Sequence, residues 1–172
     1  ASNPINLDWS LDGFRHEKSL KTENSMYSYY YFKSEEEVDY LNAGNSDVIN
    51  DVDWVAYKQH FFSSSLLTDT PFNNATVTST DLVLNEEIDT VFTKRYELKT
   101  PLELSNGELN YNMKWFYGPS DYNLLTTYED TDLDQTADLG WGIFGFLNRT
   151  VFYPVFNFLK GILSNYGLII IL

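Results

Sequence analysis

The carboxylates of this chain end at Asp138, and that break constrains what it can fold into more than any other feature. All 25 Asp and Glu residues lie at or before Asp138, together with nine of the eleven Lys and Arg residues. Residues 1–138 therefore carry a formal charge of −16, whereas residues 139–172 carry +2. We interpret the first part as an acidic body that folds in water, and the second as an apolar tail that needs an apolar surface.

The charge and the composition exclude several classes of function. An acidic body repels phosphate backbones, so we expect no nucleic-acid partner. Without cysteine the chain has no disulfide, no thiolate zinc site and no thiol nucleophile. His16 and His60 are far apart in the sequence, and we interpret both as structural. No Ser-His-Asp order, GxSxG or glycine-rich phosphate loop stands out, so we expect no catalytic residue, no cofactor and no enzyme activity.

The acidic stretch Asp130–Asp134 does not predict a calcium site. An EF-hand loop that begins at Asp130 requires glycine at its sixth position and glutamate at its twelfth, where this chain has Gln135 and Trp141. We therefore expect no metal ligands. A carboxylate pair for glycoside hydrolysis is defined by its separation in space, and nothing in the sequence singles one out among 25 acids.

The body reads as an antiparallel β-sandwich. Residues 5–11 alternate between apolar and polar, which predicts a half-buried strand that ends in a turn at Asp12-Gly13. Further strands are expected over residues 52–62, 77–84, 91–100 and 109–117. Turns are expected at the three glutamates 35–37 and at the hairpin pair Asn106-Gly107. Several strands with turn signals and little helical periodicity are typical of a sandwich.

The strands are expected to end at Gly118-Pro119, because proline cannot donate to a ladder. Ser120 or Asp121 can then cap a short helix that runs through Tyr128.

The tail allows two interpretations. Residues 153–163 are rich in apolar side chains, with a narrow polar stripe at Asn157, Lys160, Gly161 and Ser164. Such a helix is either part of a soluble core or lies in a membrane interface, and we favour the interface. The residues that we expect at this interface are Trp141, Phe152, Phe156, Leu159, Lys160, Leu163 and Tyr166.

The final run, Tyr166–Leu172, is uninterrupted apolar sequence. As a helix it covers only about 10 Å at about 1.5 Å per residue. A bilayer core needs about 30 Å. The run is therefore either a last buried strand or the start of a transmembrane helix.

Four ordered segments resemble signatures of the YidC family of membrane protein insertases. Residues 133–141 (LDQTADLGW) are similar to its L-D-x-T-x-D-x-G-W segment, and residues 164–171 (SNYGLIII) to its G-N-W-G-x-x-I-I-I. Residues 117–125 (YGPSDYNLL) resemble Y-G-P-K-x-Y-x-x-L, with Ser120 in place of the usual basic residue. Residues 54–62 (WVAYKQHFF) resemble the strand W-V-A-x-x-Q-x-Y-F.

The resemblance implies a fold and a domain order. The fold is a β-supersandwich similar to galactose mutarotases, of which this chain would be the C-terminal half, with exposed sheet edges. The implied segments are a periplasmic sandwich (1–118), a helical linker (119–139), an amphipathic elbow helix at the membrane interface (140–163) and the start of a transmembrane helix (164–172). The linker motif residues are Gly118, Pro119, Asp134, Thr136, Asp138 and Gly140.

The resemblance also implies a function. The chain would face the periplasm at the bacterial inner membrane and assist the insertion and folding of nascent membrane proteins, alone or with the Sec translocon and its accessory subunits. Lipid contact would come through residues 140–172. Two alternatives stay open: a carbohydrate-binding or mutarotase-like sandwich, because that fold is shared with sugar enzymes, and a surface lipoprotein or adhesin domain.

Overall fold

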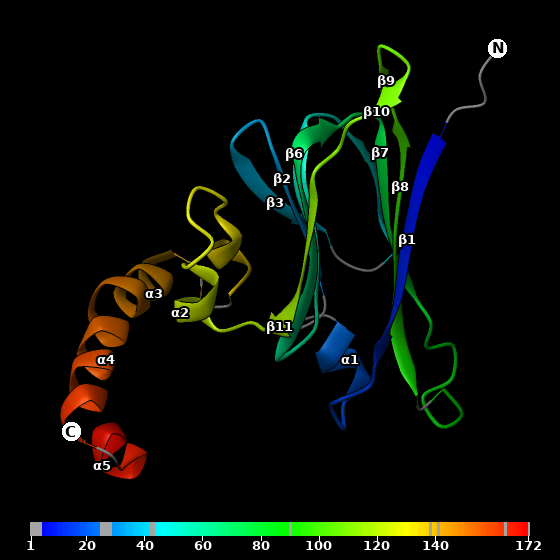
Figure 1. The fold of residues 1–172 in the computed structure, drawn as a ribbon. Coiled ribbons are helices and arrows are strands. Elements are labelled where there is room, and N and C mark those ends of the chain that lie inside the picture. Colours follow the sequence, from blue (N-terminus) through cyan, green and yellow to red (C-terminus); the bar gives the residue numbers. More distant parts are fainter. Residues whose placement is uncertain are drawn as a thin grey trace. The chain divides into compact units, whose positions relative to one another are not determined.

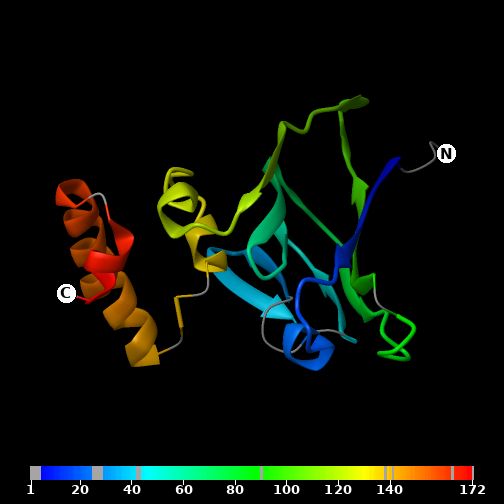
Figure 2. The same cartoon turned by 90° about the horizontal axis from the view of Figure 1, so that it is seen from below.

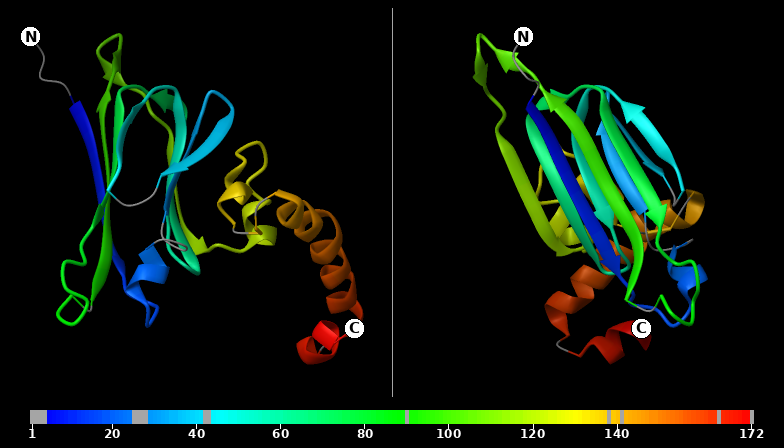
Figure 3. Two further views of the ribbon diagram at one scale, coloured as in Figure 1. Left: turned by 180° about the vertical axis from the view of Figure 1, so that it is seen from behind. Right: turned by 90° about the vertical axis from the view of Figure 1, so that its right-hand side faces the viewer.

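The chain divides into two units, Ala1–Thr136 and Ala137–Leu172. The computed structural model describes residues 5–24, 29–41, 44–89, 91–137, 139–140, 142–163 and 165–171. The first unit is built from two antiparallel sheets that face each other (Figures 1 and 3). The predicted antiparallel sandwich, followed by short helices, is confirmed.

The first sheet has the order β1-β8-β7-β4 and the second the order β11-β6-β5-β2-β3. The strands of the first sheet are β1 (Ile5–Phe14), β8 (Phe92–Leu102), β7 (Ala75–Asp81) and β4 (Ser46–Ile49). Those of the second are β11 (Met113–Pro119), β6 (Phe62–Phe72), β5 (Val52–Lys58), β2 (Tyr29–Ser34) and β3 (Glu37–Leu41). A small hairpin, β9 (Leu104–Ser105) and β10 (Glu108–Leu109), stands apart from both sheets.

The core lies between the two sheets and is partly aromatic. Trp9 stacks on Tyr57 with ring centroids 3.9 Å apart, and Tyr57 stacks on Tyr96 at 5.1 Å. The Tyr57 hydroxyl donates to the carbonyl oxygen of Trp9 (3.0 Å), and the Tyr96 hydroxyl to that of Lys58 (3.0 Å). Each buried phenol therefore joins one sheet to the other while its polar end is satisfied. Aliphatic side chains fill the remaining core: Val52, Val55, Leu66, Ala75, Val77 and Leu98.

The predicted turn at Asp12-Gly13 is wrong, because β1 continues through both residues to Phe14. The Asp12 carboxylate receives two hydrogen bonds from the Arg95 guanidinium of β8, at 2.6 and 2.7 Å. This bidentate pair keeps the strands together where the local sequence favours a turn. The register shifts only between Gly13 and Phe14.

The single strand expected over residues 52–62 is two strands. β5 ends at Lys58, and the Gln59 N–H donates to the carbonyl oxygen of Phe62 (2.8 Å), which closes a turn before β6. The expected turns at the glutamates and at Asn106-Gly107 are confirmed. Glu35 (φ 51°) and Glu36 (φ 67°), like Asn106 (φ 53°) and Gly107 (φ 84°), have the paired positive φ angles of tight hairpins.

β11 includes Gly118 and Pro119 as its last residues, so the strand ends just after them. Proline is tolerated there because β11 is the end strand of its sheet. β1 is likewise an end strand, and the Trp9 and Trp115 rings meet edge to face at 4.9 Å. Trp115 and Tyr117 remain 45% and 64% exposed, so the sandwich is open between β1 and β11.

A short segment closes one end of the sandwich. Residues 15–24 contain α1 (Leu20–Thr22), capped by the Ser19 side chain, and lie between the sheets at that end (Figure 2). Leu20 and Glu23 are buried, and the Glu23 carboxylate accepts the backbone N–H groups of His16 (2.9 Å) and Glu17 (3.2 Å). The segment is therefore fixed by its own backbone contacts.

Candidate functional site

One candidate region is the linker that follows β11 and packs on the outer face of the second sheet. It contains α2 (Tyr122–Leu125), whose N-cap is Asp121, and the 3-10 helix η2 (Leu133–Thr136). The Asp121 cap is confirmed, although the helix ends at Leu125 and not at Tyr128. Because these residues belong to the first unit, the linker is part of the folded body up to Thr136.

The packing around position 118 explains why glycine occurs there. Phe116 points to the outer face of the sheet, is buried, and meets the Tyr128 ring edge to face at 5.4 Å. A Cβ atom added to Gly118 would lie 2.8 Å from the Phe116 Cζ atom. Glycine at this position therefore leaves room for the ring that attaches the linker to the sheet.

Trp54 fixes the next part of the linker. Its buried indole Nε1–H donates to the carbonyl oxygen of Thr131 (2.7 Å), and the Lys33 ammonium pairs with the Asp132 carboxylate (2.9 Å). Leu133 and Thr136 follow, both fully buried, and the Thr136 hydroxyl donates to the carbonyl oxygen of Leu133 (2.7 Å). The motif positions 133 and 136 therefore fix the linker to the sandwich.

The remaining linker motif residues are Pro119, Asp134, Asp138 and Gly140. Pro119 is exposed at the end of β11 and Asp134 is half-buried in η2. Asp138 lies outside the described residues. Gly140 belongs to the second unit, where its φ of 86° requires glycine. The Leu139 carbonyl oxygen beside it accepts the Asn148 side-chain amide (2.7 Å).

A separate candidate region is the helical run of the second unit. α3 (Gly142–Leu147), the π-helical segment η3 (Asn148–Phe152) and α4 (Tyr153–Ile162) follow one another without a break. The wide π turn comes directly before Pro154, which has no N–H and whose ring would collide with the carbonyl of an ordinary α-turn. The proline is thus accommodated inside a longer helix.

α5 (Tyr166–Ile171) packs against α4 and covers part of it. The Tyr166 ring lies 6.2 Å from the Phe156 ring, and the Lys160 ammonium lies 5.7 Å above Tyr166. Phe156, Leu159 and Leu163 are accordingly half-buried. Of the interface residues predicted from the sequence, Phe152, Lys160 and Tyr166 are exposed, and Trp141 lies outside the described residues.

A different face of the second unit carries the exposed apolar surface. α4 exposes Val155, Phe158 and Ile162, the last two at 68% and 65%. Their spacing of three and four residues places them on one side of the helix. Further exposed apolar side chains occur along the same unit: Ile143, Phe144, Phe146, Val151, Phe152, Leu168, Ile170 and Ile171. Such a surface on so small a unit indicates an apolar partner.

The end of the chain is helical through Ile171, so the alternative of a last buried strand is wrong for the described residues. Ile170 and Ile171 are exposed, and only Ile169 is buried. Within the part of the chain that the structure describes, every helix is too short or too polar to cross a bilayer.

The fold brings the two histidines, distant in sequence, to one end of the sandwich. The His60 Nδ1 atom lies 2.6 Å from Glu17 Oε1, and the His16 Nε2 atom lies 3.3 Å from Gln59 Oε1. These contacts are not predictable from local sequence, because they depend on the turn after β5 meeting the segment after β1. No group of three or more metal-ligating side chains occurs among the described residues.

Comparisons with known proteins place the chain among its relatives. A model of the YidC periplasmic domain matches residues 9–154. The membrane protein insertase YidC of Parabacteroides distasonis is 29% identical over the whole chain. That of Porphyromonas gingivalis W83 is 32% identical over 96% of it, and that of Cytophaga hutchinsonii 29% over 98%. The chain spans about 28% of the length of these relatives.

Proposed function

The chain belongs to the YidC family of membrane protein insertases, and from that premise we propose that it is the part of a bacterial inner-membrane insertase that faces the periplasm. The sandwich acts as a scaffold and docking module, and residues 140–172 lie at the membrane interface. The whole protein assists the insertion and folding of nascent membrane proteins, alone or with the Sec translocon and its accessory subunits. It does so without enzymatic turnover.

The exposed apolar surface of the second unit is the observation that carries this proposal. Phe158 and Ile162 project from a unit that contains no carboxylate after Asp138 and carries Arg149 and Lys160. Apolar side chains next to cations favour a surface with acyl chains beneath anionic headgroups. The first unit, with its strongly negative charge, is repelled by the same headgroups and stays in water.

Flotation of the full chain with phospholipid vesicles tests the proposal. Phe158→Asp puts a carboxylate on the exposed face of α4, and we expect it to abolish flotation. Ile88→Asp adds the same charge at a 74% exposed apolar residue of the sandwich and serves as the matched control, with flotation unchanged. Equal flotation of the two variants would count against the membrane role of the tail.

The second candidate, a mutarotase-like enzyme, is favoured by one observation, the His60–Glu17 pair. In this structure the two side chains bind each other at 2.6 Å, and the His60 ring stacks on Phe61 at 3.9 Å. A histidine–carboxylate pair alone does not define a catalytic site, which also needs a cavity for the substrate beside it. We therefore expect no acceleration of aldose mutarotation, and a rate that is lost in His60→Gln would favour the enzyme instead.

A further inference from the structure

A bulge in β5 places one carboxylate on the outer face of the second sheet. On the β2 side Lys33 pairs with Trp54 and Ser34 with Val52, so Asp53 is passed over. On the β6 side the ladder likewise runs from Trp54 to Val52 without a partner for Asp53. An unpaired bulge residue leaves the alternation of the strand, so its side chain can share a face with its neighbour.

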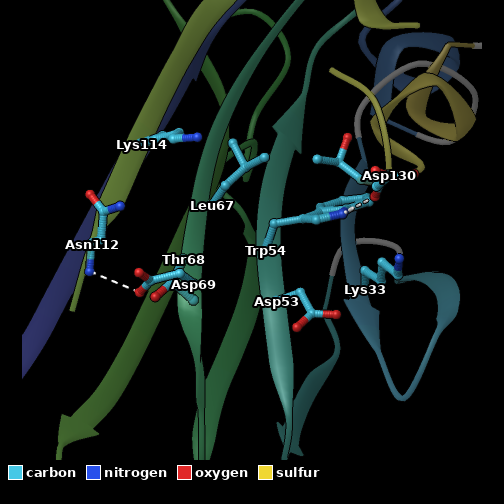
Figure 4. A pocket seen from close by; sticks show the side chains of 10 residues that line it. Lys33, Asp53, Trp54, Leu67, Thr68, Asp69, Asn112, Lys114 and Asp130 are labelled. Carbon is cyan, nitrogen blue, oxygen red and sulfur yellow. Dashed lines mark hydrogen bonds between the residues drawn. The ribbon is translucent and has the colours of Figure 1, made fainter. Parts of the chain in front are cut away.

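Asp53 and Trp54 accordingly line one pocket of about 330 Å³ (Figure 4). Figure 4 shows Lys33 and Asp130 on one side of it and Lys114 and Asn112 on the other. Trp54 and Leu67 form its apolar floor, although both side chains are nearly covered. The adjoining loop contains Asp130 and Asp132 at positive φ (61° and 56°) and is fixed by the Trp54–Thr131 hydrogen bond.

Some charged side chains of this pocket have hydrogen-bond or ion-pair partners, and Asp53 has none among the described residues. Lys33 is neutralised by Asp132, and Asp69 accepts the Asn112 N–H at 3.0 Å, a hydrogen bond that lowers the pKa of Asp69. Asp53 is half-buried and has no hydrogen bond or ion pair with any residue in the described part of the chain. A carboxylate without a partner at the wall of a pocket can accept charge-assisted hydrogen bonds from a cation.

We propose that this pocket receives the basic side chain of a partner polypeptide, with Asp53 as its counterion and Asp130 at the rim. The strongly acidic body attracts such a partner over long range. The volume is near the lower limit of ligand pockets, about 300 Å³, and suits one arginine or lysine side chain. A sugar is disfavoured because Trp54 is only 1% exposed and offers no ring face for stacking. This inference does not depend on the insertase proposal.

The probe is a short acetylated peptide amide, Gly-Ser-Arg-Ser-Gly, titrated into the full chain. The readout is the NMR resonance of the Trp54 indole N–H, which donates into the pocket wall. We expect this resonance to shift, and a peptide with neutral citrulline in place of arginine to leave it unmoved. Asp53→Asn is expected to weaken binding at least fivefold. Asp8→Asn removes the same charge from an exposed position of β1 and should change the affinity for the peptide less than twofold.

Three results would overturn the inference: equal binding of the citrulline peptide, equal weakening by Asp53→Asn and Asp8→Asn, or no shift of the Trp54 resonance at millimolar peptide. Thermal unfolding shows whether Asp53→Asn is folded. If it is not, Asp130→Asn replaces it, because asparagine tolerates the left-handed backbone of that residue. Binding unchanged by Asp130→Asn would then also count against the pocket.

Discussion

The substitution Gly118→Ala tests how the linker is attached to the sandwich. The new Cβ would lie 2.8 Å from Phe116 Cζ and 3.1 Å from Cε2, so the Phe116 ring must move. That ring is buried and contacts the Tyr128 ring edge to face, so it cannot move away without disturbing its neighbours. Overpacking of this kind costs about 1–3 kcal/mol. Replacing a strand glycine by alanine returns about 0.5–1 kcal/mol of backbone entropy. We therefore expect a net loss of up to about 2.5 kcal/mol in the free energy of unfolding.

A double-mutant cycle with Phe116→Ala isolates this contact. Removing the ring by itself costs about 3–5 kcal/mol. It also removes the three atoms nearest to the alanine Cβ at position 118, all of which belong to Phe116. In that background we expect Gly118→Ala to be neutral or slightly stabilising. Urea unfolding of the four proteins, followed by tryptophan fluorescence, measures the coupling. An equal effect of Gly118→Ala with and without the Phe116 ring would show that the ring does not cause the loss of stability.

Two further substitutions test the packing and the buried charge. Leu133→Ala should lower the free energy of unfolding by about 2–5 kcal/mol because the Leu133 side chain is fully buried. Leu124→Ala, at an exposed position of α2, should cost far less. Equal costs in urea unfolding would contradict the packing of the linker on the sheet. Burial lowers the pKa of Lys94 to about 8, with Asp81 and Glu23 opposing the shift. Between about pH 8 and pH 10.5 the unfolded chain therefore binds more protons at Lys94 than the folded chain, so stability rises with pH, by up to about 3 kcal/mol. The test is the free energy of unfolding measured at about pH 8 and at about pH 10.5, which should not rise between these values in Lys94→Met. The same rise in Lys94→Met as in the unchanged chain would contradict this prediction.

Local patterns predicted the sandwich well where strand alternation and turn chemistry agreed. Asn106-Gly107 forms its hairpin because both residues adopt positive φ at little cost. Asp12-Gly13 carries the same kind of signal but stays in β1, since the Arg95 guanidinium across the sheet binds Asp12. The turn after Lys58 is not predicted by the sequence because Gln59-His60-Phe61 contains neither glycine nor proline.

The roles of the residues in the candidate regions were harder to predict from the sequence than the strands were. The buried positions Leu133 and Thr136 were expected on a linker, and the structure assigns them a packing role on the sheet that holds Trp54. Of the residues predicted for the membrane interface, Phe156 is half-buried beside α5, whereas Phe158, which is absent from that prediction, is exposed. The β5 bulge that turns Asp53 outward depends on the register of three strands, which a single sequence does not contain.

We propose that the exposed apolar face of α4 lies in lipid. Because the chain has no cysteine, Phe158→Cys and Ile88→Cys each accept one nitroxide label. With anionic vesicles, power-saturation EPR should find the label at position 158 exposed to oxygen and shielded from a water-soluble nickel complex. The label at position 88 should stay open to nickel. A label at position 158 that is as open to nickel with vesicles as without them would contradict the account.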